Sequence, residues 1–281
     1  MKKTVLTLIV FALTANVSAQ LKVDASGNVG IGKDPQYKLD VAGDVFFGNG
    51  SNVFGTTNSN PITFKVNNSL VGFTGSYTNN NVSFGFGSLS SPLTELRNTA
   101  YGYYSLGCNT TGDNNTANGW GTLNSNTIGN ANTATGNAAL KSNTEGSSNT
   151  AIGANALYYN VTGNSNTAAG NCALYVNIGD GNTAIGQLAL GSNTTGNYNT
   201  ADGLLALYYN TGSFNTATGC NALQRNTIGN YNTALGKDAL YSNTTGSYNI
   251  AIGCFAGALN PVDLTNATAI GYMQLIPEAI R

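Results

Sequence analysis

The chain has 281 residues and a net charge of only −1, and charged residues make up 8 % of it, against about 25 % in a typical soluble domain. It contains no histidine, so the commonest general base and metal ligand is absent. The few charges are scattered along the sequence and form no basic patch that could bind nucleic acid. Composition therefore argues against an enzyme and against a nucleic-acid-binding protein.

The first 19 residues have the features of a signal peptide. Residues 1–3 are basic at two positions, residues 4–15 are apolar, and residues 17–19 are small, which favours cleavage before Gln20. The alternative is a membrane anchor, but a span needs roughly 20 apolar residues. No later segment is apolar enough to cross a bilayer. We therefore expect an exported protein without an integral membrane segment.

Residues 20–80 are predicted to be a β-rich segment with loops. Between residues 21 and 47 apolar residues alternate with glycines around Pro35, which predicts two short strands joined by a turn. Residues 48–63 are typical of a loop, and 62–66 and 70–73 are predicted to be further strands.

Residues 81–271 are a periodic array with the consensus N-T-A-x-G-x-x-A-L-x-x-N-T-T-G-x-x. Ten clear copies follow a weaker one at Asn81; two copies have 16 residues and the last has about 18. In the ten clear copies the Asn at position 1, the Ala at 3, the Gly at 5 and the Asn at 12 never change. A short fixed period predicts a solenoid whose rungs pack mainly on their neighbours. The clear copies begin at Asn98, Asn115, Asn132, Asn149, Asn166, Asn182, Asn199, Asn215, Asn232 and Asn249.

The first half of each copy alternates like a short strand. Positions 1, 3 and 5 are predicted to face a crowded interior, and positions 2 and 4 to face outward. In the first two clear copies the inward residues are Asn98, Ala100, Gly102, Asn115, Ala117 and Gly119. The repeated Asn is expected to bond to its equivalent in the next rung.

The second half, x-x-A-L-x-x-N, is compatible with a second strand or with a single helical turn, and T-T-G is predicted to form the turn to the next rung. The fold class we expect is mainly β: a parallel β-roll or β-solenoid of about eleven 17-residue rungs, with short helical turns in the second half-rung as an open alternative.

Such a rod has a thin core, because each rung contributes only one Leu and a few small residues. A single chain would be marginally stable on that count, and association of several chains side by side would compensate. The candidate contact surface consists of tyrosines at positions 10 and 11, which could instead simply face solvent: Tyr158, Tyr159, Tyr208 and Tyr209.

The four cysteines are not expected to form disulfides. Cys220 and Cys254 share position 6 but lie two rungs, or about 9–10 Å, apart, beyond disulfide reach. Cys108 and Cys172 belong to rungs distant from both and from each other. All four are interpreted as small buried or half-buried residues.

We expect no catalytic residues, no cofactor and no metal site. No cysteine cluster has zinc-binding spacing. No pair of acids recurs in a way that suits acid–base catalysis, because the acids of the array are assigned to different repeat positions: Asp113, Asp180, Asp202, Asp238 and Asp263.

The N-T-A-I-G motif at 149–153 and 182–186, with its variants at 249–253 and 267–271, resembles the YadA-like head repeats of trimeric autotransporter adhesins. The resemblance implies a left-handed parallel β-roll, a homotrimer on the bacterial outer surface, and a host surface protein as partner. The adhesin heads have a shorter period than this chain. Neither the coiled-coil stalk nor the membrane anchor of that family follows the array, so we do not expect a complete autotransporter.

The motifs G-N-V-G-I-G (27–32) and L-D-V-A-G (39–43) resemble a second group, exported or phage tail-fibre-like proteins with repeat shafts. Many of these end in a cleavable chaperone domain that assembles the trimer, and we expect that domain to be missing here. Residues 272–281 match no repeat. They are either a natural short terminus or the product of a truncation or frameshift.

Three functions are compatible with this sequence. The first is a secreted or cell-surface, adhesin-like rod that binds a protein or glycan on a host or neighbouring cell. The second is a purely structural shaft of a tail-fibre-like assembly. The third, a minor alternative, is an ice-binding solenoid, which the irregular position 4 disfavours although Thr at position 2 would stack.

Overall fold

The computed structural model describes residues 80–90, 97–258, 263 and 265–274 in full, and the backbone of five strands before residue 80. The chain divides into two compact units, Met1–Gly55 and Thr56–Arg281, and each is described by itself. The expected signal peptide, nearly all of the predicted loop at 48–63 and residues 275–281 lie outside the described residues.

The first unit contains a three-stranded sheet in the order β1-β2-β3. β1 (Leu21–Val23) pairs antiparallel with β2 (Val29–Ile31), and β2 pairs in parallel with β3 (Leu39–Val41). The two strands predicted around Pro35 are β2 and β3. The third strand, β1, was not anticipated.

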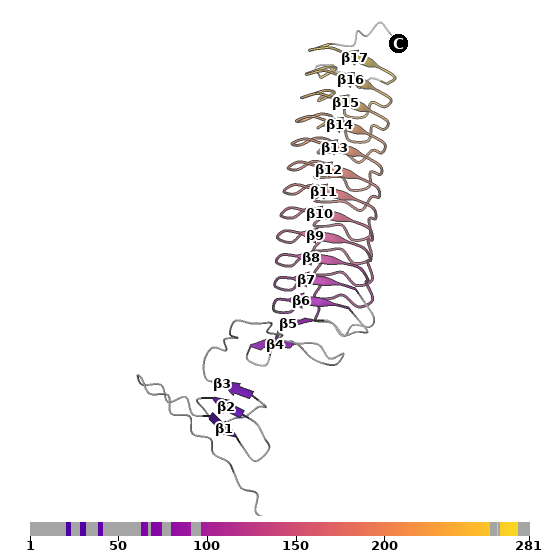
Figure 1. Ribbon diagram of the computed structural model, residues 1–281. Helices are drawn as coiled ribbons and strands as arrows, with labels where there is room; N and C mark the ends of the chain where they lie inside the picture. The colour runs from indigo at the N-terminus through magenta and orange to yellow at the C-terminus, as the bar shows by residue number, and fades with distance from the viewer. Residues whose placement is uncertain are drawn as a thin grey trace, which may run out of the picture. The chain divides into compact units, whose positions relative to one another are not determined.

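The second unit is built on one sheet of 14 strands that follow each other in chain order (Figure 1). It starts with the two predicted strands, β4 (Thr63–Val66) and β5 (Ser69–Thr74), which form an antiparallel pair. β5 also pairs antiparallel with β6 (Val82–Phe84), the strand of the first rung. β4 and β5 therefore extend the sheet of the repeats at its N-terminal end.

From β6 to β17 all strands are parallel, and each pairs with the next copy in strict register. The predicted parallel β-solenoid is confirmed. The left-handed coil that the resemblance implies stays a prediction. The remaining strands are β7 (Thr99–Tyr101), β8 (Thr116–Asn118), β9 (Thr133–Thr135), β10 (Thr150–Ile152), β11 (Thr167–Ala169), β12 (Thr183–Ile185), β13 (Thr200–Asp202), β14 (Thr216–Thr218), β15 (Thr233–Leu235), β16 (Ile250–Ile252) and β17 (Thr268–Ile270).

Each strand has one buried face, as the alternation predicts. In β10 the central Ala151 is fully buried, whereas Thr150 and Ile152 point outward. The core also contains the Ala and Leu of positions 8 and 9, such as Ala156 and Leu157, which are fully buried as well. The core is thus a narrow stack of Ala and Leu columns, bounded by buried Asn.

The second half-rung is neither a strand nor a helix, so both conformations considered from the sequence are wrong. Positions 7 and 9 adopt a positive φ, 56° at Asn155 and 52° at Leu157. A helix needs consecutive right-handed residues, and these left-handed ones turn the peptide groups along the rod axis instead. The Leu157 N–H donates to the carbonyl of Ala173 in the next rung (3.0 Å), and the Asn155 N–H donates to Asn137 in the previous one (2.9 Å). No helix occurs in the described residues.

Glycine at position 5 is required by space as well as by backbone angle. Gly153 has a φ of 131°, and a Cβ built on it would lie 2.5 Å from the carbonyl oxygen of Gly170 in the next rung. For Gly102 and Gly119, the distance from such a Cβ to the carbonyl oxygen of the next position-5 glycine is 2.3 Å. The backbones of successive rungs therefore approach each other closely at this position.

Candidate interaction surfaces

The Asn residues at position 1 form a buried ladder that serves the fold. In the described rungs they are fully buried. Asn149 illustrates the pattern: its Oδ1 accepts from the backbone N–H of Asn166 (2.9 Å), and its Nδ2 donates to Oδ1 of Asn132 (3.1 Å) and to the carbonyl of Gly163 (2.8 Å). The predicted rung-to-rung bonding of these side chains is confirmed, and they are not available to a ligand.

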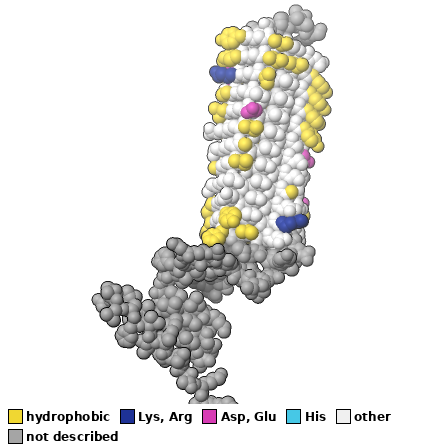
Figure 2. Space-filling model, in the orientation of Figure 1, with side chains coloured by type: hydrophobic (Ala, Val, Ile, Leu, Met, Phe, Trp, Pro, Cys, Tyr) yellow, Lys and Arg dark blue, Asp and Glu magenta, His cyan; other side chains and the backbone are white. Residues whose placement is uncertain are grey.

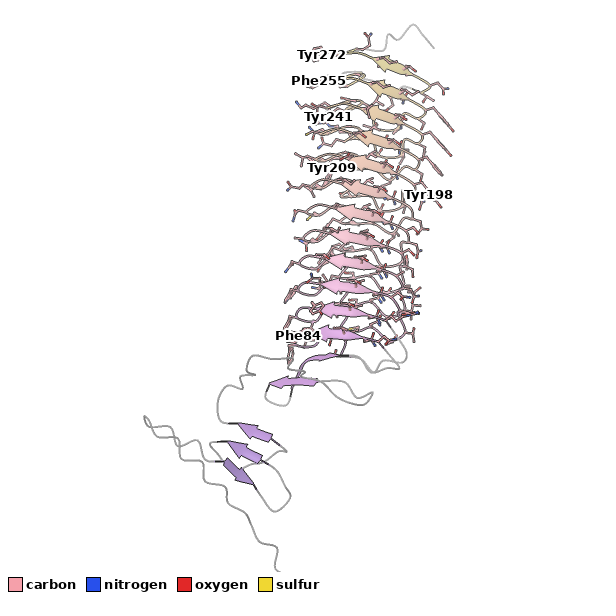
Figure 3. All side chains as sticks on the ribbon, viewed as in Figure 1. Phe84, Tyr198, Tyr209, Tyr241, Phe255 and Tyr272 are labelled. Atoms are coloured by element: carbon pink, nitrogen blue, oxygen red, sulfur yellow. The ribbon has the colours of Figure 1, made fainter. Side chains whose placement is uncertain are left out.

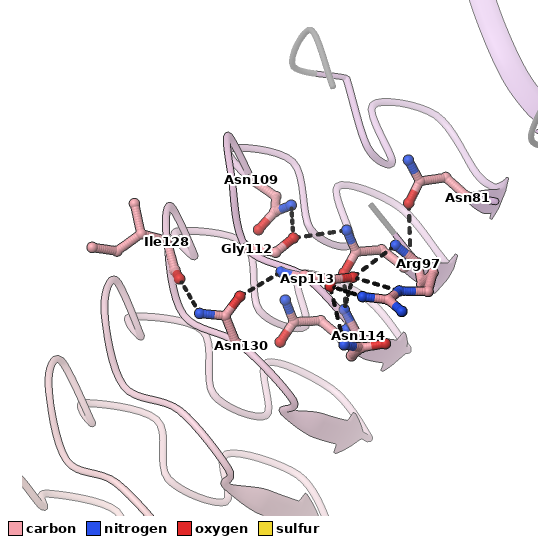
Figure 4. Close-up of polar contacts among 10 residues, drawn as sticks. Asn81, Arg97, Asn109, Gly112, Asp113, Asn114, Ile128 and Asn130 are labelled. Carbon is pink, nitrogen blue, oxygen red and sulfur yellow. Dashed lines mark hydrogen bonds and ion pairs between the residues drawn. The ribbon is translucent and has the colours of Figure 1, made fainter. Parts of the chain in front are cut away.

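A second ladder is formed by the Asn at position 12. Asn160 donates from Nδ2 to Oδ1 of Asn143 (3.0 Å) and to the carbonyl of Gly163 (2.9 Å). The Gly163 carbonyl therefore accepts from both ladders of its own rung, and joins them. Figure 4 shows the corresponding bond from Asn109 to Gly112 near the start of the array.

A third ladder, at position 16, was not recognised in the sequence. The Asp113 N–H donates to Oδ1 of Asn130 (2.8 Å, Figure 4), and the Asn130 N–H donates to Oγ of Ser147 (3.0 Å). From Asp113 to Ser247 this position holds only Asp, Asn or Ser, the short side chains that carry an acceptor oxygen. Asp113 and Asp180 both belong to this column, so the expectation that the acids fall at different repeat positions is wrong for these two.

Asp113 and Asp263 are the acids whose pKa departs from the ordinary value. The hydrogen bond from the Arg97 guanidinium, above all, lowers the pKa of Asp113 to about 2 despite its desolvation, and Asp113 in turn raises the pKa of Arg97. Desolvation would raise the pKa of Asp263, but hydrogen bonds from Thr244 and Thr245 outweigh it and lower the pKa to about 2. Asp113 lies in the first clear copy of the array, and Asp263 lies in the longer last copy.

The outer face of the parallel sheet carries two columns. Position 2 is Thr in nine consecutive strands, β7 to β15, and these hydroxyls make no hydrogen bond within the described part of the chain. Position 4 varies, but large apolar residues are exposed at seven of its twelve places: Phe84, Tyr101, Ile152, Ile185, Leu235, Ile252 and Ile270. This face is flat, nearly uncharged and partly apolar.

The tyrosines predicted as a contact surface form two separate clusters. Tyr159 and Tyr209 are exposed, whereas Tyr158 and Tyr208 are half-buried. Each adjacent pair packs edge to face with ring centroids 4.6 Å apart. Tyr175 joins the first pair, with its ring centroid 5.2 Å from that of Tyr159. Desolvation by burial is the largest cause that raises the pKa of Tyr175, and a hydrogen bond with Tyr159 is the second. The two clusters lie three rungs apart, so they form no continuous surface, and their role as a contact surface stays a prediction.

A longer aromatic surface lies at position 17, and sequence reasoning missed it. Tyr198, Phe214, Tyr231 and Tyr248 occupy this position in four consecutive rungs. Their rings stack in parallel with centroids 4.9–5.4 Å apart and interplanar angles of 4–16°. We call these four residues the aromatic strip. Figure 2 shows hydrophobic side chains in a band along one edge of the rod, the edge from which Tyr198 projects in Figure 3.

Another aromatic cluster lies in the first three rungs. At position 6, Phe86 stacks on Tyr103 with centroids 5.7 Å apart, and Tyr103 stacks on Trp120 at 6.5 Å. The Lys141 ammonium lies 5.1 Å from the centroid of the Trp120 ring, within the range of a cation–π contact. A cation thus covers one end of this cluster.

The cysteines are all free. Cys172, Cys220 and Cys254 are half-buried, as interpreted from the sequence, but Cys108 is exposed, so the buried or half-buried interpretation is wrong for it. Position 11 points outward in this rung, which places the Cys108 thiol on the surface.

Within the described ranges, no group of three or more Cys, Asp or Glu side chains could hold a metal ion. The same part of the chain contains no helix that could span a membrane. The fold and its surfaces define a parallel β-solenoid of short repeats. Comparison of the chain with protein-family models, with curated proteins and with solved structures found no match.

Proposed function

We propose that the chain is an exported, non-catalytic rod that associates with copies of itself as a homotrimer and binds other surfaces, as an adhesin-like or fibre rod of a bacterial outer surface. The observation that carries this proposal is the exposed apolar column at position 4 of the sheet. Apolar patches exposed on a soluble protein mark sites of association, and the longest uninterrupted run in this column is Leu235, Ile252 and Ile270 on three successive strands. A chain whose rungs bury only small residues and one Leu gains stability when such a face is covered.

The resemblance of the N-T-A-I-G motifs to adhesin head repeats supports the same proposal, and the signal-peptide features support export. The partner would be a protein or glycan on a host or neighbouring cell.

Sedimentation equilibrium of the secreted chain tests the association. We expect a trimer, and we expect the double variant Ile152→Thr/Ile185→Thr to dissociate, because it removes two apolar side chains from position 4. Thr is native at this position in Thr135 and Thr218, so the variant is compatible with the rung.

The matched control is Ile128→Thr/Ile228→Thr, which changes two exposed residues of the turn. It should leave the trimer intact. A wild-type chain that is a stable monomer at micromolar concentration would contradict the proposed assembly.

Binding of the assembled rod to immobilised collagen, mucin and glycans then separates the adhesin-like rod from the structural shaft. An adhesin-like rod binds at least one of them, and a shaft binds none. An assembled rod that binds none would leave the shaft as the function.

Ice binding is a second candidate because of one observation, the column of nine threonines with unbonded hydroxyls on a flat face. The second column needed for a two-dimensional array is interrupted, for example by Ile152 and Asp202. Thermal hysteresis of the purified chain, measured against buffer, decides this candidate: its absence at millimolar protein rejects it.

A further inference from the structure

The aromatic strip is not explained by the needs of the fold. Position 17 has a positive φ in every rung from Asn114 to Asn266, and outside the strip it holds small or polar residues, such as Asn114, Ser148 and Ser165. Left-handed backbone favours Gly and Asn and disfavours bulky side chains. Four aromatic residues in succession therefore occupy a position that small residues fill elsewhere.

The strip is exposed and ordered. Its side chains keep 47–59 % of their surface accessible. At its N-terminal end the stack packs directly on the backbone of Gly181 in the preceding rung. A Cβ added to Gly181 would lie only 2.6 Å from the Tyr198 ring. Since the rings cover each other's faces, they offer a partner their edges and the phenol hydroxyls of Tyr198, Tyr231 and Tyr248, which make no hydrogen bond within the described residues.

Within its own four rungs the strip has uncharged neighbours, and the exposed Asp180 lies one rung before Tyr198. Between Gly196 and Ile250, no charged residue occupies positions 15 to 17, 1 or 2. On the strand side the strip is flanked by the unbonded hydroxyls of Thr200, Thr216 and Thr233. The surface thus combines a narrow apolar ridge with a parallel row of neutral hydrogen-bonding groups, which suits a neutral partner that is itself rich in hydroxyls.

The spacing of the strip limits the shape of that partner. Its rings repeat every 4.9–5.4 Å along the rod. An extended polypeptide advances by about 3.3 Å per residue and presents like-facing side chains at about twice that distance, which does not match. An extended chain of β-1,4-linked pyranoses advances by about the length of one sugar ring per unit, which is close to one rung.

We propose that the aromatic strip binds an extended, neutral β-1,4-linked polysaccharide that lies parallel to the rod axis. The apolar face of the sugar ribbon packs along the ring edges, while its hydroxyls bond to the tyrosine and threonine hydroxyls. The proposal rests on the proposed function only in that the rod binds other surfaces. The aromatic strip is a different column from the position-4 residues proposed for self-association, but the threonines that flank it lie on the same sheet face as those residues.

Co-sedimentation of the full chain with insoluble cellulose and with chitin tests the proposal. The variant is Tyr198→Ser/Phe214→Ser/Tyr231→Ser/Tyr248→Ser. Ser is native at position 17 in Ser148 and Ser165, so every substituted rung has a natural counterpart. We expect the wild type to sediment with at least one polymer, and the fourfold variant to bind at least tenfold less.

The control variant is Tyr159→Ser/Tyr209→Ser, at position 11, where Ser is native in Ser142 and Ser192. It removes exposed tyrosines elsewhere and should bind like the wild type. The proposal is overturned if the wild type binds neither polymer, or if the fourfold variant binds equally well. It is also overturned if the fourfold variant loses self-association in sedimentation equilibrium, which would assign the strip to a second copy of the chain.

The two proposals fail separately. A trimer that binds no polysaccharide contradicts this inference and leaves the assembly intact. A monomer that binds polysaccharide through the strip contradicts the assembly alone.

Discussion

At the scale of single residues, the two asparagine ladders show why a polar residue fills the core of this rod. An amide group carries both a hydrogen-bond donor, the NH₂, and an acceptor, the oxygen. One Asn side chain can therefore bond to the previous rung, to the next rung and to the turn of its own rung. A carboxylate could only accept, and would bring charge into the interior. The bonds of Asn149 to Asn132, Asn166 and Gly163 use the full capacity of one amide in this way.

We therefore expect Asn149→Ala to destabilise the protein strongly. It leaves the Asn166 N–H and the Gly163 carbonyl with fewer partners in a buried setting, and each unsatisfied buried group costs about 1–3 kcal/mol. Chemical denaturation should show a loss of about 3 kcal/mol or more. Asn118→Ala, at an exposed position 4, is the control and should change stability by less than about 0.5 kcal/mol. Equal effects of the two changes would show that the ladder contributes nothing.

Two glycines separate the effect of crowding from that of backbone angle. Gly153→Ala places a Cβ 2.5 Å from the Gly170 carbonyl at a φ of 131°, whereas Gly121→Ala, at a φ of 62°, meets nothing within 4 Å. The second change costs only the left-handed conformation, about 1–2 kcal/mol. The first should cost clearly more, seen as a lower Tm than that of the Gly121 variant. A Gly153 variant that melts no lower would mean that the rungs can move apart at this point.

The acids at the two ends of the array make stability depend on pH. Because the folded pKa of Asp113 and of Asp263 is lowered to about 2 from an ordinary 3.8, their contribution is present above about pH 4 and is lost as the pH falls through about 2. We expect Asp113→Asn/Asp263→Asn to lower Tm slightly at pH 6, and the difference from wild type to vanish near pH 2. The effect is small because both groups are solvent-accessible. A difference that grows on acidification would contradict the assignment.

At the scale of the rung, the sequence predicts one half well and the other poorly. The alternation of Thr, Ala and Gly gave the strand, its inward face and its parallel register. The second half could not be predicted, because Leu157 and its equivalents adopt a left-handed conformation that Leu rarely takes. That conformation is stabilised by bonds to neighbouring rungs, and composition carries no trace of it.

The surfaces were predicted less well than the fold, for a different reason. A consensus averages over all copies. It therefore hid the aromatic residues at position 17, which occur only in the four consecutive rungs that start with the one containing Tyr198. The position-16 ladder was visible in principle, since Asp113, Asn130 and Ser147 share one chemical property, an acceptor oxygen on a short side chain. It was missed because identity, and not chemistry, defined the consensus.

The rung as the structural unit leads to a prediction about deletions. Removal of residues 149–165 takes out one complete rung, so Asn132 and Asn166 become neighbours and all three ladders rejoin. We expect this variant to fold and to melt within a few degrees of the wild type, because stability in a repeat protein is a sum of nearest-neighbour terms. Circular dichroism melts provide the measurement.

The control is removal of residues 149–157, which takes out the strand and the Leu of the same rung, removes Asn149 from the first ladder and leaves Asn160 and Asn164 without the half-rung that positions them. It should fail to give a cooperative melt at all. If both deletions behave alike, the rung is not the unit of stability.

At the scale of the whole solenoid, each rung is supported only by the rung before and the rung after it. Terminal rungs have one neighbour fewer, so they should open more often than central ones. We expect the amides of Leu157 and Leu174 to exchange hydrogen most slowly, and that of Gly271, which directly follows the last strand, to exchange much faster. Hydrogen exchange followed by mass spectrometry measures this gradient. Uniform protection along the array would indicate a single cooperative unit instead.

The two rungs of 16 residues show where the solenoid accepts a change of length. In one of them a single residue, Ile178, separates Asn177 from Gly179, whereas two residues separate Asn160 from Gly163 in a 17-residue rung. The Asn177 side chain still donates to the glycine carbonyl (2.8 Å) and to Asn160 (3.1 Å), so neither ladder is disturbed. This turn is therefore the place to graft foreign peptides into the rod, where copies inserted in successive rungs would be displayed in a row about 4.8 Å apart.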